Sequence, residues 1–295
     1  GMAGINSTAA ATASISVSNN NFQGFVHSVT GSGAIVFIQI THNKSTAGLT
    51  DNINGNTFTN ITANTTGSVW FISRTGISGS GVNVTENCNN NSIVGSFNKT
   101  AAGGIVYLYN APTDSGMGGG FMVQTGNNFS NINLVGSTMA GWSNRDYYTS
   151  PSIYAAQKTI SNNIFQNWNC GSSSVIALQV AGGGNGTAIT GNSIQNISAA
   201  GAITTIQYET IQAYTLGFSI SNNTIANINS SGNTVLGIAE GSGTSYGTST
   251  ISGNTISGLM SAGAALTEAI KVKARAPSVL DPTSTNNITK NKIYD

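Results

Sequence analysis

The amino-acid sequence predicts an all-β fold in which short parallel strands stack into a solenoid. The first observation is a phrase of the form I-x-x-N-x-[I/F], followed by a further apolar residue, that recurs nine times. The second is the spacing of the repeated asparagine, 29 to 37 residues, which lies within the range of about 20 to 50 residues typical of solenoids. The third is composition, because 37 of the 295 residues are glycine and strong helix formers are scarce.

The repeated asparagines act as a ruler, since any other residue can be placed by its distance from the preceding one. We call them the anchor asparagines; they are Asn20, Asn56, Asn91, Asn127, Asn163, Asn192, Asn223, Asn254 and Asn291. Each sits between apolar residues, where we expect a turn with left-handed backbone, a conformation that Asn tolerates. Stacked copies are expected to bond along the rod as an Asn ladder.

A second run of β-branched and aromatic residues follows each anchor. Clear examples are 34–40, 69–72, 105–109 and 175–180. Each repeat is therefore expected to hold at least two short strands, and a third before the next anchor. Strands that return to the same place once per repeat stack in parallel, so we expect eight to nine coils of 29 to 37 residues.

The repeat also resembles a known group of proteins. The segments SNNTI at 221–225, SGNTI at 252–256 and TGNSI at 190–194 are similar to the repeats of right-handed parallel β-helix proteins, the pectate-lyase-like superfamily in the broad sense. The resemblance covers nearly the whole chain and implies one right-handed parallel β-helix domain over residues 1–295, which we interpret as a fragment of a longer secreted protein. It lies in structural positions, so it does not imply an activity.

Composition argues against several classes of function. Only 6% of the residues are charged and the net charge is +1, so no basic stripe for nucleic acid is expected. No apolar run is long enough for a membrane-spanning helix. No cofactor is predicted, and the aspartates are scattered singly, which gives no support for a calcium or other metal site.

The cysteines are predicted to be free. Cys88 and Cys170 lie two repeats apart and at different distances from their anchors, which is a poor arrangement for a disulfide. We interpret both as small buried hydrophobic residues.

The few charged residues gather at a common distance from the anchors. We name the charged stripe as the residues that follow their anchors by 17 to 19 positions: Arg74, Arg145, Asp146, Glu209, Glu240 and Lys271. Aromatic residues lie in a wider zone around the stripe, 14 to 21 positions after their anchors, namely Trp70, Tyr107, Tyr109, Trp142, Tyr147, Tyr148 and Tyr208. If the coils keep the same phase, these side chains lie along one side of the rod.

Such a surface suits a polysaccharide, because sugar rings stack on aromatic faces while their hydroxyl groups bond to polar side chains. The predicted carbohydrate-binding residues are Arg74, Tyr109, Trp142, Arg145, Tyr147, Tyr148, Tyr208 and Lys271. The simpler interpretation is that these charges only solvate the outer side of a strand. The sequence leaves both interpretations open.

Catalysis is a further hypothesis, with Asp146, Glu209 and Glu240 as the candidate carboxylates. Glu209 and Glu240, one coil apart and in register, would be separated by about 5 Å, near the spacing of a retaining glycosidase. The N-T-D, D-D and G-H-G signatures of polygalacturonase-like enzymes are absent. We therefore lean towards a protein without enzymatic activity.

Three functions follow, in order of preference. The first is a bacterial, extracellular or cell-surface β-helix that serves as a structural, adhesive or glycan-binding rod, with a polysaccharide or cell-surface glycan as partner and an open oligomeric state. The second is a polysaccharide lyase or glycoside hydrolase with a lateral groove. The third is an ice-binding solenoid, for which Thr57 and Thr59 make one T-x-T pair that neighbouring repeats do not continue.

Overall fold

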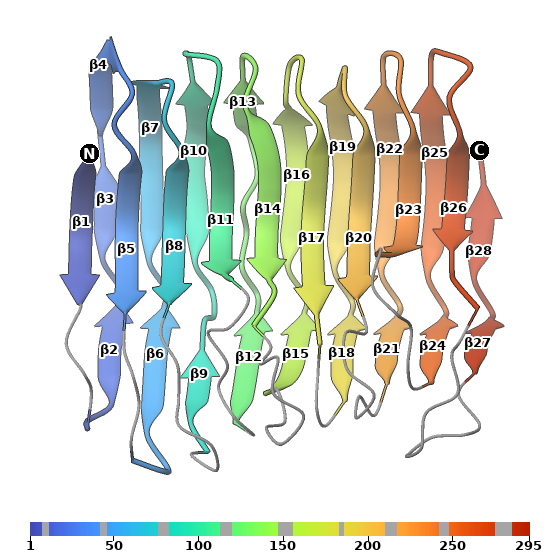
Figure 1. Cartoon of the computed structure of the whole chain (residues 1–295), viewed down its shortest axis with the longest axis horizontal. Coiled ribbons are helices and arrows are strands. Elements are labelled where there is room, and N and C mark those ends of the chain that lie inside the picture. The colour runs from blue at the N-terminus through green and yellow to red at the C-terminus, as the bar shows by residue number, and fades with distance from the viewer. Residues whose placement is uncertain are drawn as a thin grey trace.

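The computed structural model describes residues 1–7, 12–41, 46–75, 83–112, 120–146, 156–182, 186–209, 217–241, 248–274 and 285–295. Within these ranges every regular element is a strand and none is a helix. The strands form three sheets that extend along the rod from the N-terminal to the C-terminal coil (Figure 1). The all-β prediction is therefore confirmed.

The three sheets, which we name A, B and C, are each built from one strand per coil, except that the first coil gives sheet C two strands, β3 and β4. Sheet A contains β1 (Met2–Ser7), β5 (Ile35–Thr41), β8 (Val69–Thr75), β11 (Ile105–Ala111), β14 (Thr138–Asn144), β17 (Val175–Ala181), β20 (Ile203–Glu209), β23 (Val235–Glu240) and β26 (Thr267–Lys271). Sheet B contains β2 (Ile15–Ser18), β6 (Thr50–Asn54), β9 (Thr85–Asn87), β12 (Phe121–Thr125), β15 (Gln157–Ser161), β18 (Thr187–Thr190), β21 (Phe218–Ser221), β24 (Ser249–Ser252) and β27 (Asn286–Thr289). Sheet C contains β3 (Asn21–Gln23), β4 (Val26–Gly31), β7 (Thr57–Thr65), β10 (Ser92–Lys99), β13 (Ile132–Leu134), β16 (Ile164–Asn169), β19 (Ser193–Ala199), β22 (Thr224–Ser230), β25 (Thr255–Ser261) and β28 (Lys292–Tyr294).

The chain visits the sheets in the order A, B, C in each coil, and all neighbouring strands pair in parallel, as between β20 and β23. In Figure 1 the chain descends in the nearer sheet A and rises in the farther sheet C as it advances from N to C, which makes the coil right-handed. The expected third strand per repeat is present, and the number of coils is close to the number expected. The chain is a parallel β-helix.

The anchor asparagines form a continuous ladder inside the coil. Each Nδ2 donates to the Oδ1 of the next anchor, at 2.8–3.0 Å over all eight steps. From Asn56 onwards each Nδ2 also donates to a backbone carbonyl of the preceding coil, for example from Asn163 to Gln124 O at 3.0 Å. The ladder satisfies buried amides that would otherwise destabilise the core.

The left-handed backbone lies one residue before each anchor, so the prediction that the anchor itself takes this conformation is wrong. These preceding residues have φ between 54° and 67°, and they are Asn19, Gly55, Asn90, Gly126, Asn162, Gly191, Asn222, Gly253 and Lys290. Asparagine and glycine alternate at these positions from coil to coil, because the side-chain oxygen of each Asn lies against the glycine of the next coil. A Cβ on Gly126 would lie 2.3 Å from Asn90 Oδ1, so a glycine is required there.

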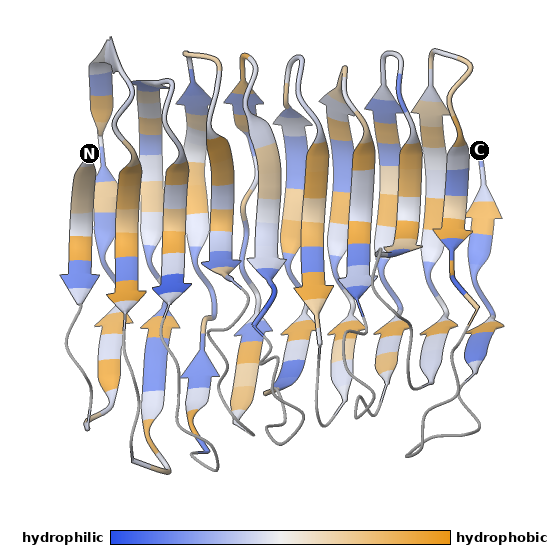
Figure 2. Cartoon of the chain, in the orientation of Figure 1, coloured by the Kyte–Doolittle hydropathy of each residue, from blue (hydrophilic) through white to orange (hydrophobic). Residues whose placement is uncertain are grey.

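The interior is a column of apolar side chains, with aromatic rings concentrated in the N-terminal coils. Phe58 stacks on Phe22 with centroids 5.2 Å apart and meets Phe71 edge-on at 4.9 Å. Figure 2 shows hydrophobic and hydrophilic bands alternating along the strands, as expected where one face of a sheet is buried. Cys88 and Cys170 are free thiols within this core, which confirms the sequence-based prediction.

Candidate functional site

The charged stripe is largely an interior feature of the corner where sheet A ends and sheet B begins. We name the A–B seam as the inward-facing polar residues of that corner: Asp51, Arg74, Glu86, Asn144, Asp146, Lys158, Thr187, Tyr208 and Glu240. All are at most 7% exposed. The expectation that the stripe forms an exposed groove is therefore wrong for Arg74, Asp146 and Glu240, which face the inside of the coil.

Arg74 lies at the centre of the seam and contacts two carboxylates. Its Nε lies 3.3 Å from Glu86 Oε2, and its Nη1 lies 3.2 Å from Asp146 Oδ2. Burial alone would lower the pKa of Arg74, but the charges of Asp146 and Glu86 raise it, so the guanidinium stays protonated. Burial raises the pKa of Glu86, while Arg74 and a hydrogen bond from the Tyr109 hydroxyl, 2.5 Å from Oε1, act in the opposite direction.

Two buried lysines bind backbone carbonyls at the corners of the coil. The Lys158 ammonium donates to Asp146 O at 2.7 Å, to Ala181 O at 2.6 Å and to Asn144 O at 3.3 Å. Burial lowers the pKa of Lys158 to about 8. At the opposite corner, between sheets C and A, Lys99 donates to three carbonyls at 2.5–2.7 Å, and burial lowers its pKa to about 8 as well. These ammonium groups provide hydrogen-bond donors to backbone carbonyls at the corners of the coil.

Three of the aromatic residues predicted to bind sugars are also in the core. Tyr109, Trp142 and Tyr208 are 0% exposed. Tyr109 and Trp142 stack on each other at 4.8 Å, and Trp142 Nε1 donates to Gln124 Oε1 at 2.8 Å. Their ring faces are covered by protein, so they offer no surface to a polysaccharide.

Glu209 and Glu240 do not form the in-register pair that the ruler predicts. Glu240 pairs with Tyr208 in the sheet, while Glu209 pairs with Ala181. The reason is one additional residue in a turn: Ile203 follows Asn192 by 11 positions, whereas its register partner Val235 follows Asn223 by 12. Glu240 therefore points inward, where its Oε2 accepts from Tyr208 at 3.3 Å and from the Lys273 amide at 3.0 Å.

Of the remaining predicted residues, Lys271 and Arg145 are at least partly exposed, Glu209 is only 7% exposed, and two tyrosines lie in the undescribed ranges. Lys271 is on the outside, where its side chain is 47% exposed and pairs with Glu268 at 3.2 Å. Arg145 is partly exposed and pairs with Glu209, with Nη2 3.4 Å from Oε2. Tyr147 and Tyr148 lie outside the described residues.

The outer face of sheet A carries a different set of side chains, which includes two aromatic residues that were placed beside the stripe but not predicted to bind sugars. Trp70 and Tyr107 pair in register, are partly exposed, and stack with centroids 6.0 Å apart and planes within 3° of parallel. Burial raises the pKa of the Tyr107 hydroxyl, and the positive charge of Arg145 acts in the opposite direction.

A row of polar side chains runs beside this aromatic pair. Sheet register aligns Gln39, Ser73, Asn110, Ser143, Gln179 and Gln207 across six consecutive coils. Ser143 Oγ donates to Gln179 Oε1 at 3.2 Å, and Gln207 Nε2 donates to Glu209 Oε1 at 2.8 Å. We name the sheet A platform as Trp70, Tyr107, Asn110, Arg145, Gln179, Gln207 and Glu209.

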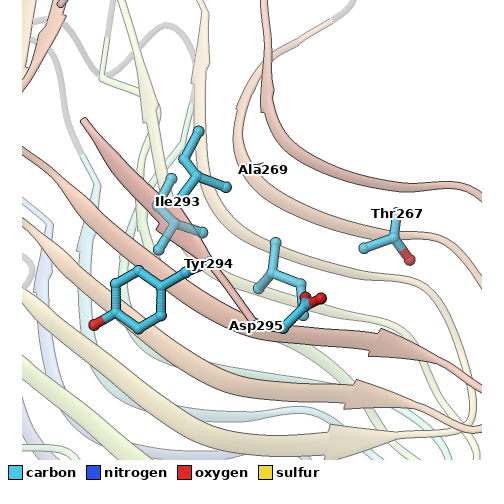
Figure 3. Close-up of a pocket in the computed structure, with 7 residues that line it drawn as sticks. Thr267, Ala269, Ile293, Tyr294 and Asp295 are labelled. Atoms are coloured by element: carbon cyan, nitrogen blue, oxygen red, sulfur yellow. The ribbon is translucent and has the colours of Figure 1, made fainter. Parts of the chain in front are cut away.

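Other candidate chemistry is limited in the described part of the chain. There, no group of three or more His, Cys, Asp or Glu side chains is placed to hold a metal ion. None of its elements is a helix long and apolar enough to cross a membrane. A cavity of about 330 Å³ lies at the C-terminal end of the core, lined by Ile293, Tyr294 and Asp295 with Thr267 and Ala269 (Figure 3).

Comparison with known proteins does not identify a family for this chain. No protein-family model, no curated protein and no solved structure matches the chain. The fold and the sheet A platform therefore rest on the chain's own residues.

Proposed function

We propose that the protein is a bacterial, secreted or cell-surface rod that binds glycans through the sheet A platform. The observation that carries the proposal is the parallel Trp70–Tyr107 pair on the outside of a rigid sheet. Partly exposed aromatic rings beside a few oriented polar groups are typical of sites for sugars. The scaffold relates most naturally to pectate-lyase-like β-helices in the broad sense, used for binding rather than for cleavage.

The charge of the platform favours an uncharged polysaccharide. Arg145 is paired with Glu209, so the guanidinium is not free to attract a strongly acidic chain. The amides of Gln179 and Gln207 lie one coil apart, about 4.8 Å along the rod, and that of Asn110 lies two coils before Gln179. They offer donors and acceptors to the hydroxyl groups of a glycan that lies along the axis.

A glycan array followed by titration calorimetry tests this function. We expect binding to at least one neutral polysaccharide, and at least a tenfold loss of affinity in Trp70→Ala and in Tyr107→Ala. Phe121→Ala is the matched control, because Phe121 is an aromatic residue 48% exposed on sheet B. An array without hits, or equal affinity in all three variants, would contradict the proposal.

The enzymatic alternative is tested with the same polysaccharides. Lyase or hydrolase activity would release unsaturated products or reducing ends. Of the candidate carboxylates, Asp146 and Glu240 belong to the buried seam, and both oxygens of Glu209 are engaged by Arg145 and Gln207. Product formation that Glu209→Gln abolishes would favour the enzyme over the binding rod.

The ice-binding alternative has little geometric support. Sheet register places Thr57 between Asn21 and Ser92, and Thr59 between Gln23 and Val94. A regular T-x-T array is therefore not built around this pair on sheet C. Thermal hysteresis in solution would revive the alternative.

A further inference from the structure

The ion pair between Arg145 and Glu209 crosses two coil steps on the sheet A platform. Arg145 directly follows β14 and Glu209 ends β20, while Ala181, the register partner of Glu209, lies between them on β17. Asp146 and Tyr208, which adjoin the pair in the chain, are fully buried. Because neighbouring residues of an extended chain point to opposite sides, Arg145 and Glu209 project to the outer side of the coil.

The carboxylate of Glu209 is held by two donors of the platform. Arg145 Nη2 lies 3.4 Å from Oε2, and Gln207 Nε2 donates to Oε1 at 2.8 Å. The side chain of Glu209 is only 8% exposed although it projects outward. Arg145 and Gln207 thus form a site for a carboxylate on the outer side of sheet A, and a carboxylate of the chain itself occupies it.

The next coil leaves room for Glu209 in this position. A Cβ on Gly241 would lie 2.4 Å from Glu209 Cγ and 2.6 Å from its Oε1. A larger residue at position 241 would therefore displace the carboxylate from its two donors. Glycine at this position is compatible with a Glu209 side chain that stays beside Arg145 and Gln207.

Glu209 does not use every donor that the guanidinium offers. Bonds between arginine and carboxylate are typically about 2.7–2.9 Å long and often come in pairs, whereas the bond from Arg145 to Glu209 is 3.4 Å long. Arg145 Nε is buried and has no hydrogen-bond partner in the described part of the chain. A carboxylate from outside would find suitable donors here, but it must first displace Glu209 and overcome its negative charge.

We propose that Glu209 determines the charge specificity of the platform: it occupies the carboxylate site of Arg145 and Gln207 and thereby excludes acidic glycans. The inference rests on the proposed glycan-binding function. Without the charge of Glu209, the same site takes the carboxylate of a uronic acid residue, with Arg145 as its counter-charge. The preference of the platform then changes from uncharged to acidic polysaccharides.

Titration calorimetry with polygalacturonate, alginate and methyl-esterified polygalacturonate tests this role, because the ester differs from its parent polymer chiefly in charge. Glu209→Gln keeps the size of the side chain and removes its charge. We expect this variant to bind at least one of the two acidic polymers at least about tenfold more tightly than the unchanged protein does. The gain should fall as the salt concentration rises, and it should be absent with the ester and in the double variant Glu209→Gln/Arg145→Gln.

Glu268→Gln is the matched control. It makes the same change in net charge and removes the partner of Lys271, which lies on β26, five strands from β11 in sheet A. We expect no gain in affinity for the acidic polymers in this variant. An equal gain in Glu268→Gln and Glu209→Gln would overturn the proposal, because net charge alone would then explain the result. No gain in Glu209→Gln with either acidic polymer would overturn it as well.

The same titrations separate this inference from the proposed function. If the unchanged protein binds a neutral glycan but Glu209→Gln gains no acidic one, the platform stands and the role of Glu209 falls. If the unchanged protein binds no glycan but Glu209→Gln gains an acidic one through Arg145, the glycan-binding function of the native platform falls. The exclusion of acidic chains by Glu209 is supported in that case.

Discussion

Arg74 and Asp146 form an ion pair inside the coil, with Nη1 3.2 Å from Oδ2, although 72 residues separate them in the chain. The pair reaches past β11, which lies between β8 and β14 in sheet A. Because Glu86 binds the same guanidinium, one cation serves two buried carboxylates. The A–B seam is thus a structural element that joins coils to one another.

Loss of Arg74 should destabilise the rod strongly. Arg74→Met leaves Glu86 and Asp146 buried without their cation, and removal of one partner from a buried ion pair costs about 3–5 kcal/mol. Denaturant unfolding measures the effect. Lys271→Met is the control, since this exposed pair with Glu268 contributes about 1 kcal/mol or less. Equal losses in the two variants would contradict the role assigned to the seam.

The buried ladder of anchor asparagines should contribute more to the free energy of unfolding than the exposed row of asparagines on sheet C. Asn163→Leu removes the donor to Asn192 Oδ1 and to Gln124 O, and we expect a loss of at least about 2 kcal/mol in the free energy of unfolding. Asn196 belongs to an exposed row and donates to Asn167 Oδ1 at 3.0 Å. Its φ is 54°, so Asn196→Gly keeps the backbone and should cost less than about 1 kcal/mol. A larger loss of stability in Asn196→Gly than in Asn163→Leu would show that the anchor ladder does not stabilise the fold strongly.

The alternation of asparagine and glycine before the anchors predicts a coupled pair of positions. Gly126→Ala places a Cβ 2.3 Å from Asn90 Oδ1 and forces alanine into left-handed backbone, with φ 67°. The backbone cost is about 1–2 kcal/mol, and the overlap adds about 1–3 kcal/mol. In the Asn90→Gly background only the backbone cost remains. A double-mutant cycle with no coupling between the two positions would refute the steric explanation.

Lys158 should make stability depend on alkaline pH. Its folded-state pKa is about 8, and an unfolded lysine has a pKa of about 10.4. Between these values the unfolded state binds more protons, so the free energy of unfolding rises with pH, by up to about 1.4 kcal/mol per pH unit. Below both pKa values Lys158 is protonated in the folded and in the unfolded state, so it does not make the free energy of unfolding depend on pH.

Denaturant unfolding at several pH values between about 7 and 10.5 checks this prediction. The stability difference between the parent and Lys158→Met should grow from about pH 8 to about pH 10.4 and then level off. Comparison of the two proteins removes the contributions of the buried thiols and of Tyr109, whose pKa values are raised by burial. Lys271→Met should follow the parent throughout. Parallel curves for parent and Lys158→Met would show that this lysine keeps an ordinary pKa.

The repeat predicted the fold and the ladder because both depend on a period, and a period is visible in one sequence. The nine anchors mark one corner of every coil, and the structure places them in a continuous row. The pairing of Trp70 with Tyr107 follows from the same period, since both lie in the apolar run after their anchors.

The side of the strand to which each residue points could not be predicted from its distance to the anchor. Turn lengths differ from coil to coil, as between Asn192 and Ile203 and between Asn223 and Val235. A difference of one residue turns a side chain to the opposite face of a strand. For this reason the sequence predicts the stripe on the outside of the coil, whereas Arg74, Asp146 and Glu240 lie inside it.

Buried arginine, lysine and carboxylates contradict the usual expectation that charge marks a surface. Arg74 and Lys158 are inside because their partners are supplied by other coils, and Asp146 lies far from Arg74 in sequence. Such partners cannot be matched from a spacing rule. The ionic seam therefore emerges only when the coils are stacked.

Carboxyl labelling of the native protein with a carbodiimide and an amine, read by mass spectrometry, tests the central claim most directly. Glu86 and Asp146 are 1% and 0% exposed, whereas the side chain of Glu268 is 31% exposed. The account predicts that Glu268 is modified while Glu86 and Asp146 remain unmodified until the protein unfolds. Modification of Glu86 or Asp146 at the rate of Glu268 would contradict it, because the stripe would then face solvent as an open groove.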